Sequence, residues 1–301
     1  NRFPDSREKS IWVVAETFQG GLRRGTLEML GKARELSARP RSEVAAVVFG
    51  DASSGLVNQL ASHGADRVLV LDNSSLGPIC SRGVVQSLAE AITTAQPYAV
   101  LFASTPDGRD LASRIAARLK LGLTGDAIDL EINDKDQLVQ LKPALGGNVI
   151  APILSKTLPN LVTLRPGLLS PIAPEEGATA PIETIAPVPC EGADVTLLEE
   201  HQLEQADGVG LTQAQVVVGV GMGIGGEENL THIQALVRSV GASLATTRNV
   251  VHSGWLPHQI QVGISGRTIA PQVYLAVGIR GAFNHTVGIQ KAGVILAINQ
   301  N

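Results

Sequence analysis

Short apolar runs alternate with amphipathic stretches through the first 120 residues, and this alternation constrains the fold more than any other feature of the chain. The runs have the length of buried strands, and the stretches have helical periodicity. The runs lie at 11–15, 44–49, 68–71 and 99–103, and the helical stretches at 26–36, 82–95 and 109–119. Strand–helix–strand units of this kind form parallel sheets, and right-handed crossovers place helices on both faces. The pattern therefore predicts an α/β fold.

The composition suits such a sheet. Aromatic residues account for only 3% of the chain, whereas hydrophobic residues as a whole account for 44%. The core must therefore be filled by Val, Ile, Leu and Ala, which are common in parallel strands and in the helices that cover them. A single core rarely grows beyond ~250–300 residues, so this chain of 301 residues is expected to form two domains.

Beyond residue 120 the pattern changes, which locates the end of the first domain. Short strand patterns, expected to complete the first sheet, lie at 127–132, 138–141, 149–154 and 161–164. Residues 166–189 are rich in Pro, Ala and Glu and lack periodicity, which is typical of a surface excursion or linker, and 194–200 is expected to form a last strand. We place the boundary at 206–211, so the predicted domains are 1–206 and 207–301.

Charge, cysteine content and hydropathy exclude several classes of protein. The net charge is -4 and dense runs of Lys or Arg are missing, so the basic surface of a nucleic-acid-binding protein is not expected. Cys80 and Cys190 are the only cysteines, too few for a disulfide framework, an iron–sulfur cluster or a zinc site, and no metal is expected. The sequence contains no apolar run near the ~20 residues that cross a bilayer, and no signal peptide is evident. These features favour a soluble protein of a reducing compartment, the cytoplasm or else the mitochondrial matrix.

A second strand–turn–helix unit begins at 216–218. The strand runs into a glycine-rich turn, residues 219–226, and a helical pattern follows at 228–240. Such a turn aims backbone N–H groups at a phosphate, although many α/β proteins use glycines simply to turn tightly between strand and helix. No acidic residue follows at the spacing that a nicotinamide dinucleotide site uses to bind the ribose, which weakens a dehydrogenase interpretation.

Residues 248–299 carry the strongest indication of a ligand site, because glycine-bounded loops interrupt what otherwise reads as core strands. His285 follows two glycines and an alanine, so the backbone before it is short of side chains, as happens where a flat ligand approaches closely. Taken singly, His285 is as well explained by a hydrogen-bonded core histidine, Arg248 by a surface arginine, and Ser265 by a turn serine. Their occurrence together and in this order favours a binding site.

Motifs in both halves of the chain resemble those of the electron transfer flavoprotein alpha subunit family. They lie at 108–112, 116–119, 122–126, 143–148 and 163–167 in the first half and at 273–285 in the second. The resemblance spans nearly the whole chain and implies a nucleotide-hydrolase-like parallel-sheet domain that contacts a beta subunit, followed by a Rossmann-type domain that binds FAD. Because the family continues beyond Asn299 with a further strand and helix, the second domain is expected to be incomplete at residue 301.

The resemblance also implies roles for individual residues. Ser265 resembles the hydroxyl that hydrogen-bonds flavin N5, Arg248 the guanidinium placed against the ring system, and His285 the partner of the pyrimidine carbonyl. The family's other positions around the ring, the ribityl chain and the pyrophosphate correspond to Thr247, Val262, Gly263, Ile264, Arg280, Gly281, Ala282, Phe283, Asn284 and Asn299.

Three positions depart from the family pattern. Met222 stands where many relatives have Arg, Ile264 where Gln is usual, and Arg280 where they have Ser. Our hypothesis is that Arg280 supplies the phosphate-binding charge that position 222 lacks, because a guanidinium pairs bidentately with phosphate.

The family resemblance implies a redox electron carrier rather than an enzyme that converts a substrate. FAD on this subunit would accept electrons from a flavin dehydrogenase and pass them to a quinone oxidoreductase or another acceptor. The beta subunit, a separate chain, would complete the flavin environment and carry AMP or a second FAD, and a hinge at 206–211 would let the second domain move. One alternative is the alpha subunit of an NADH-dependent electron-bifurcating complex. Another is a flavin-free structural subunit, which Met222, Ile264 and the short tail favour.

Overall fold

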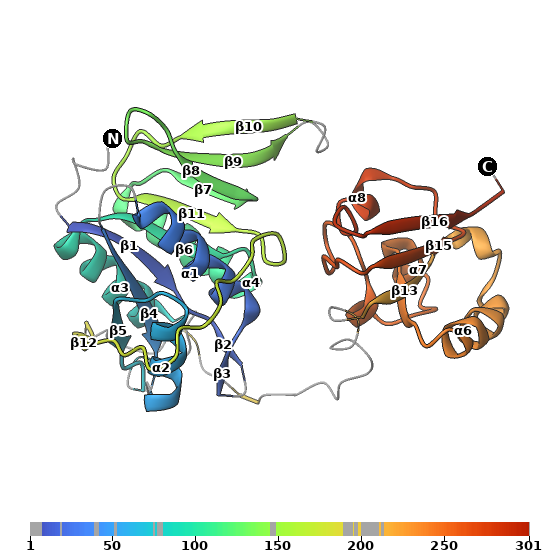
Figure 1. Ribbon diagram of the computed structural model, residues 1–301, viewed down its shortest axis with the longest axis horizontal. Coiled ribbons are helices and arrows are strands. Elements are labelled where there is room, and N and C mark those ends of the chain that lie inside the picture. Colours follow the sequence, from blue (N-terminus) through green and yellow to red (C-terminus); the bar gives the residue numbers. More distant parts are fainter. Residues whose placement is uncertain are drawn as a thin grey trace. The chain divides into compact units, whose positions relative to one another are not determined.

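The computed structural model describes residues 8–18, 20–38, 42–50, 53–74, 76, 81–144, 149–188, 195, 198–199, 211 and 214–300. The chain divides into two compact units, Asn1–Glu200 and His201–Asn301, and Figure 1 labels most of the helices and strands of each. The predicted boundary and hinge at 206–211 and the strand predicted at 194–200 lie largely outside the described residues, and both cysteines lie wholly outside them. The predicted domains 1–206 and 207–301 therefore stay a prediction.

The N-terminal unit is built on a seven-stranded sheet with the order β12-β5-β4-β1-β6-β11-β7. Its strands are β1 (Glu8–Val14), β4 (Glu43–Phe49), β5 (Arg67–Leu71), β6 (Pro97–Ala103), β7 (Leu123–Ala127), β11 (Asn160–Leu164) and β12 (Ile182–Ile185). Every neighbouring pair is parallel. All residues of β6 are buried, which requires cover on both faces of the sheet.

Helices provide this cover in two pairs (Figure 1). They are α1 (Arg24–Ser37) and α2 (Ser54–Ser62) on one face, and α3 (Arg82–Ala95) and α4 (Pro106–Leu119) on the other. Successive residues of β1 enter opposite cores, so Ile11 packs with α1 and α2 whereas Trp12 packs with α3 and α4. Full burial of an aliphatic side chain such as that of Ile11 contributes about 1.5–3 kcal/mol. The predicted α/β fold is confirmed.

Residues 128–154 depart from the expectation that they complete the first sheet. β8 (Asp129–Ile132), β9 (Leu138–Ala144) and β10 (Val149–Leu154) form a separate antiparallel sheet, while β7 and β11 alone extend the parallel one. The reason lies in the connection between β8 and β9. Asn133 Oδ1 accepts hydrogen bonds from the N–H groups of Lys135 and Gln137, which closes a tight turn, and a tight turn can join only antiparallel strands.

The segment predicted as a linker, 166–189, also contains regular structure. Its residues Ile182–Ile185 form β12, which pairs with β5 at the edge of the main sheet. A hydrogen bond from Val68 N–H to the carbonyl of Pro181, the residue before β12, adds to this pairing. Three of the four residues of β12 are exposed, so this strand lacks the apolar periodicity by which buried strands are recognised.

The C-terminal unit holds a four-stranded parallel sheet with the order β14-β13-β15-β16. Its strands are β13 (Val216–Val220), β14 (Ser243–Thr246), β15 (Val273–Val277) and β16 (Val294–Ile298). Its helices are α6 (Leu230–Ser239), α7 (Arg248–His252) and α8 (Phe283–Thr286), with short 3-10 turns η3 (Met222–Ile224), η4 (Glu227–Asn229) and η5 (His258–Ile260). This is the Rossmann-type arrangement that was predicted.

The order of these strands defines a switch point. From β13 the chain moves to β14 on one side, and later returns to place β15 on the other side of β13. In open parallel sheets, ligands bind beyond the carboxyl ends of the two strands that flank such a point. In the described part of the chain, no helix is long and apolar enough to cross a membrane, and no cluster of side chains has the make-up of a metal site.

Candidate functional site

Predicted site residues follow the carboxyl ends of three of the four parallel strands of the C-terminal unit. Thr247 comes directly after β14, residues 280–285 come shortly after β15, and Asn299 comes directly after β16. Because all four strands run in the same direction, these segments meet at one edge of the sheet. Hydrogen bonds then connect the segments to one another.

The glycine-rich loop after β13 packs against the loop after β15. The N–H groups of Gly221 and Gly223 donate to the carbonyls of Val277 and Gly278, both at 2.9 Å. A Cβ at position 221 would overlap the Gly278 carbonyl oxygen and lie 2.8 Å from its carbon, and one at position 223 would lie 2.8 Å from Gly278 Cα. These two glycines are therefore needed for backbone contact between loops. The prediction that this loop aims its N–H groups at a phosphate is wrong for both of them.

An uninterrupted row of free backbone donors lies in the loop after β15. The N–H groups of residues 279–284 have no acceptor within the described part of the chain. Positive φ values at Gly278 (+64°) and Gly281 (+71°) give this loop a shape that other residues rarely adopt. Consecutive unpaired N–H groups in a turn form an anion-binding concavity. Arg280 is exposed in the same loop and adds a full positive charge.

The loop 262–267 is held against its neighbours on both sides. Val262 N–H donates to the Thr246 carbonyl at the end of β14, and Ile264 N–H donates to the Asn284 carbonyl at 2.7 Å. Gly263 has φ of +135°, and a Cβ there would overlap the Asn284 carbonyl oxygen. Position 263 can therefore lie against residue 284 only when it is glycine. Ser265 is exposed at the tip of this loop.

His285 is buried, and both of its ring nitrogens have partners inside the unit. Nδ1 lies 3.0 Å from the Val262 carbonyl and Nε2 lies 2.9 Å from the Tyr274 hydroxyl. A carbonyl can only accept, so Nδ1 carries the proton and Nε2 accepts from Tyr274. Burial lowers the pKa of His285, an effect that the bond to Val262 opposes, and burial raises the pKa of Tyr274. The ring is thus held neutral as the Nδ1–H tautomer.

Strand β13 makes room for this pair of side chains. A Cβ at position 219 would overlap the Tyr274 hydroxyl and lie 3.0 Å from its Cε1. Gly219 therefore belongs to the packing of Tyr274 rather than to a phosphate-binding turn. Tyr274 was not among the predicted site residues, although it is one of only two tyrosines in the chain and lies in an otherwise aliphatic strand.

The remaining site residues lie at the rim. Arg248 opens α7 and is exposed, and its Nε donates to His252 Nε2 at 3.2 Å. Thr247 N–H donates to the Val220 carbonyl, which fixes the end of β14 against β13. Asn299 Nδ2 donates to the Ile279 carbonyl at 3.3 Å and so ties the end of β16 to the loop with free donors. The predicted residues thus form one connected set, and the donors among them suit an anionic, flat ligand.

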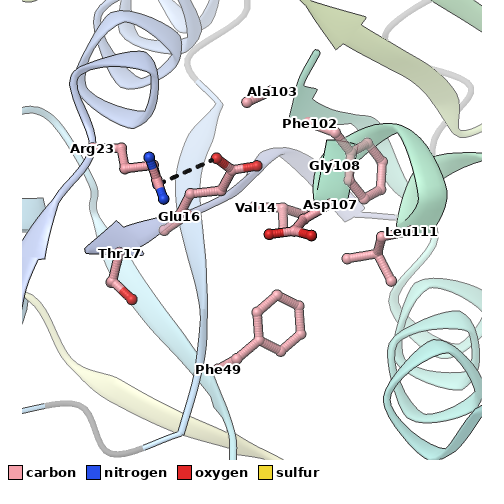
Figure 2. A pocket seen from close by; sticks show the side chains of 11 residues that line it. Val14, Glu16, Thr17, Arg23, Phe49, Phe102, Ala103, Asp107, Gly108 and Leu111 are labelled. Atoms are coloured by element: carbon pink, nitrogen blue, oxygen red, sulfur yellow. Dashed lines mark ion pairs between the residues drawn. The ribbon is translucent and has the colours of Figure 1, made fainter. Parts of the chain in front are cut away.

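A separate cavity lies in the N-terminal unit, at the carboxyl ends of β1, β4 and β6 (Figure 2). Glu16 is half-buried in its wall, accepts a hydrogen bond from the Thr105 hydroxyl and pairs with Arg23 at 3.9 Å. Burial raises the pKa of Glu16, against the opposing effects of Thr105 and Arg23. The cavity has a volume of about 50 Å³, well below the ~300–1,000 Å³ of typical ligand pockets. It is too small for a dinucleotide.

Comparison with known proteins assigns the chain to a family. Residues 11–189 match the electron transfer flavoprotein domain, and residues 210–290 match the electron transfer flavoprotein FAD-binding domain. The electron transfer flavoprotein subunit alpha of Clostridium acetobutylicum is 33% identical over 97% of this chain and 88% of its own length, and that of Thermoanaerobacterium thermosaccharolyticum is 35% identical over 97% and 89%. The subunit LctC of the lactate dehydrogenase (NAD(+),ferredoxin) of Acetobacterium woodii is 33% identical over 97% of this chain and 70% of its own length. The chain belongs to the electron transfer flavoprotein alpha subunit family.

Proposed function

We propose that this chain is the FAD-binding alpha subunit of an electron carrier that works as a heterodimer with a beta subunit. The observation that carries the proposal is the row of free N–H groups at 279–284, a loop that includes Arg280 and follows β15 beyond the switch point of the parallel sheet. Unpaired donors at this place suit the pyrophosphate of a dinucleotide. When bound, FAD supplies the redox chemistry, because its ring takes up and releases electrons.

The residues of the site divide into two groups under this proposal. Residues 279–284 and Arg280 hold the phosphates, with the guanidinium of Arg280 in the role that Met222 cannot fill. Ser265, on the loop 262–267, and Arg248, at the start of α7, orient the ring system, Ser265 as a hydrogen-bond donor to N5 and Arg248 as a positive charge. Donors and positive charges aimed at a ring that gains electron density raise its reduction potential. The remaining residues of the proposed FAD site are Thr247, Val262, Gly263, Ile264 and Asn299.

The proposed donor is a flavin dehydrogenase, and the proposed acceptor is a quinone oxidoreductase or another redox protein. The beta subunit would hold AMP or a second FAD. A bifurcating complex is the second candidate, because a relative of similar identity is named as a subunit of a lactate dehydrogenase that uses NAD and ferredoxin. The similarity to LctC extends over 97% of this chain, which is why this alternative is kept.

The first test is to purify this chain together with its beta subunit, record the visible spectrum, and release and quantify flavin and AMP. One FAD with AMP per heterodimer supports the simple carrier, and two FADs support the bifurcating complex. A colourless heterodimer that also fails to take up added FAD would refute the proposal and support a structural subunit.

A second test addresses Arg280. Arg280→Ser is expected to weaken FAD binding about 10- to 100-fold, because hydrogen bonds to charged groups contribute about 1.5–3 kcal/mol. Arg238→Ser is the matched control: it removes the same charge from the last turn of α6, which leads back toward the amino ends of the strands. Equal affinity of the wild type and Arg280→Ser, measured by titration with FAD, would exclude Arg280 from the phosphate site.

A further inference from the structure

Gln261 is a buried polar residue next to the exposed loop that carries Ser265. It is only 2% exposed, and its Nε2 donates to Ser265 Oγ at 3.0 Å. Its backbone is fixed on both sides: its N–H donates to the His258 carbonyl, and its own carbonyl accepts from Arg267 N–H at 2.7 Å. It also forms a parallel bridge with Thr246, the last residue of β14. The backbone that carries the Gln261 amide is therefore held in place on both sides.

Gly266 allows this close approach. A Cβ at position 266 would overlap the Gln261 carbonyl oxygen, and it would lie 2.8 Å from the Gln261 carbonyl carbon and 3.1 Å from Gln261 Cγ. The glycine that follows Ser265 thus lets the loop fold back over the Gln261 side chain. A glycine directly after Ser265 is therefore needed for the contact between the serine and the Gln261 amide.

The chemistry of the pair sets the direction of the serine proton. An amide NH2 group can only donate, so Ser265 Oγ accepts in this bond. The single proton of the hydroxyl is left over, and it has no acceptor among the described residues. Since Ser265 is exposed, this proton is available to a ligand that lies over the loop.

We propose that Gln261 is a positioning residue that orients the Ser265 hydroxyl as a hydrogen-bond donor to the bound flavin. The inference rests on the proposed function, because it requires an acceptor atom of the flavin ring over this loop. A hydroxyl without this bond rotates among its staggered positions and can accept from the ligand side as well as donate. A donor fixed in advance stabilises electron density that grows on the ring, so Gln261 raises the reduction potential of the flavin through Ser265.

The test is a double-mutant cycle on the FAD-loaded heterodimer, read by the midpoint potential of the flavin. Ser265→Ala is expected to lower the equilibrium constant for one-electron reduction about tenfold, which is about 59 mV. Gln261→Leu is expected to lower it in the wild-type background and to have no further effect in the Ser265→Ala background. Equal shifts in the two backgrounds, or no shift in either, would overturn the proposal.

Gln261→Glu is the matched control, because it keeps the size of the side chain and reverses the direction of the hydrogen bond. An ionised carboxylate only accepts, so it draws the Ser265 proton inward and turns an oxygen lone pair toward the ligand. The potential should therefore fall further than in Gln261→Leu. A potential equal to that of the wild type would show that the direction of the bond does not matter, and would contradict the proposed role.

A measurement on the flavin-free chain separates this inference from the proposed function. In the NMR spectrum, Ser265→Ala should shift the side-chain NH2 resonance of Gln261 and speed its exchange with water. An unchanged resonance would refute the contact. If the wild-type heterodimer binds no FAD, the proposed function fails, and the NMR result alone then decides whether Gln261 orients Ser265.

Discussion

Removing the hydroxyl of Tyr274 should destabilise the C-terminal unit by about 1–3 kcal/mol. Tyr274 is fully buried, and its hydroxyl donates to His285 Nε2 at 2.9 Å. Tyr274→Phe keeps the ring but leaves Nε2 without a donor at a place where His285 is only 6% exposed. An unpaired buried acceptor costs more than the net value of the bond itself. The loss should appear as a lower free energy of unfolding.

The two tryptophans of the chain allow each unit to be followed separately. Trp255 packs beside the core of the C-terminal unit, whereas Trp12 lies in the core of the N-terminal unit. In a Trp12→Phe background, fluorescence during urea unfolding reports on the C-terminal unit. This background loses no hydrogen bond, because Trp12 Nε1 has no partner among the described residues. Tyr98→Phe, the same change at a buried tyrosine of the N-terminal unit, should leave the Trp255 transition in place.

A second background shows whether His285 is the cause. In His285→Leu the Tyr274 hydroxyl has itself lost its acceptor, so its removal should be neutral or stabilising. The effect of Tyr274→Phe would thus change sign between the two backgrounds. The same destabilisation in both, or a loss below about 0.5 kcal/mol in the wild-type background, would refute the argument.

Three further predictions follow from single sites. Gly221→Ala should destabilise the C-terminal unit by about 3 kcal/mol or more, because its Cβ meets backbone atoms of Gly278. Gly241→Ala, with open space around it, should cost about 1–2 kcal/mol because of the positive φ of Gly241. Urea unfolding measures both free energies. Because burial lowers the pKa of His285 below 6.5, the unfolded chain takes up this proton first, so the C-terminal unit should lose stability as the pH falls below about 6.5; His285→Gln should lose less over this range. Burial raises the pKa of Glu16 above 4.5, so protonation of Glu16 favours the folded state. The N-terminal unit should therefore gain stability as the pH falls toward 4.5, and Glu16→Gln should lack this gain. If His285→Gln or Glu16→Gln unfolds with the same pH dependence as the wild type, the role given to that residue is contradicted.

The sequence was most informative about elements whose evidence is local. Apolar periodicity predicted β1, β4, β5, β6, α1, α3 and α4, because burial imposes a period on each segment separately, whereas α2 was not predicted. The expectation of two domains came from the length of the chain. The residues of the candidate site were indicated by glycine-bounded loops and by the family resemblance. That they follow the carboxyl ends of parallel strands is seen only in the structure. The sequence misplaced β8, β9 and β10, because a short strand does not show which sheet it joins. It overlooked β12, whose exposed residues carry no periodicity.

The partners of individual polar groups were decided only by the tertiary structure. The glycine-rich turn at 219–226 reads as a phosphate loop, yet Gly221 and Gly223 make room for Gly278 and their N–H groups donate to the loop after β15, whereas the N–H groups of residues 279–284 have no acceptor in the described part of the chain. Gln261 reaches Ser265 through a fold of the chain around Gly266, and His285 meets Tyr274 and Val262 from separate elements. Residue type shows that a group can donate or accept, whereas its partner depends on which distant segments packing brings within about 3 Å. The amino-acid pattern thus indicated the fold class and the residues of the candidate site, and tertiary packing determined which of their hydrogen-bonding groups have no partner in the described part of the chain.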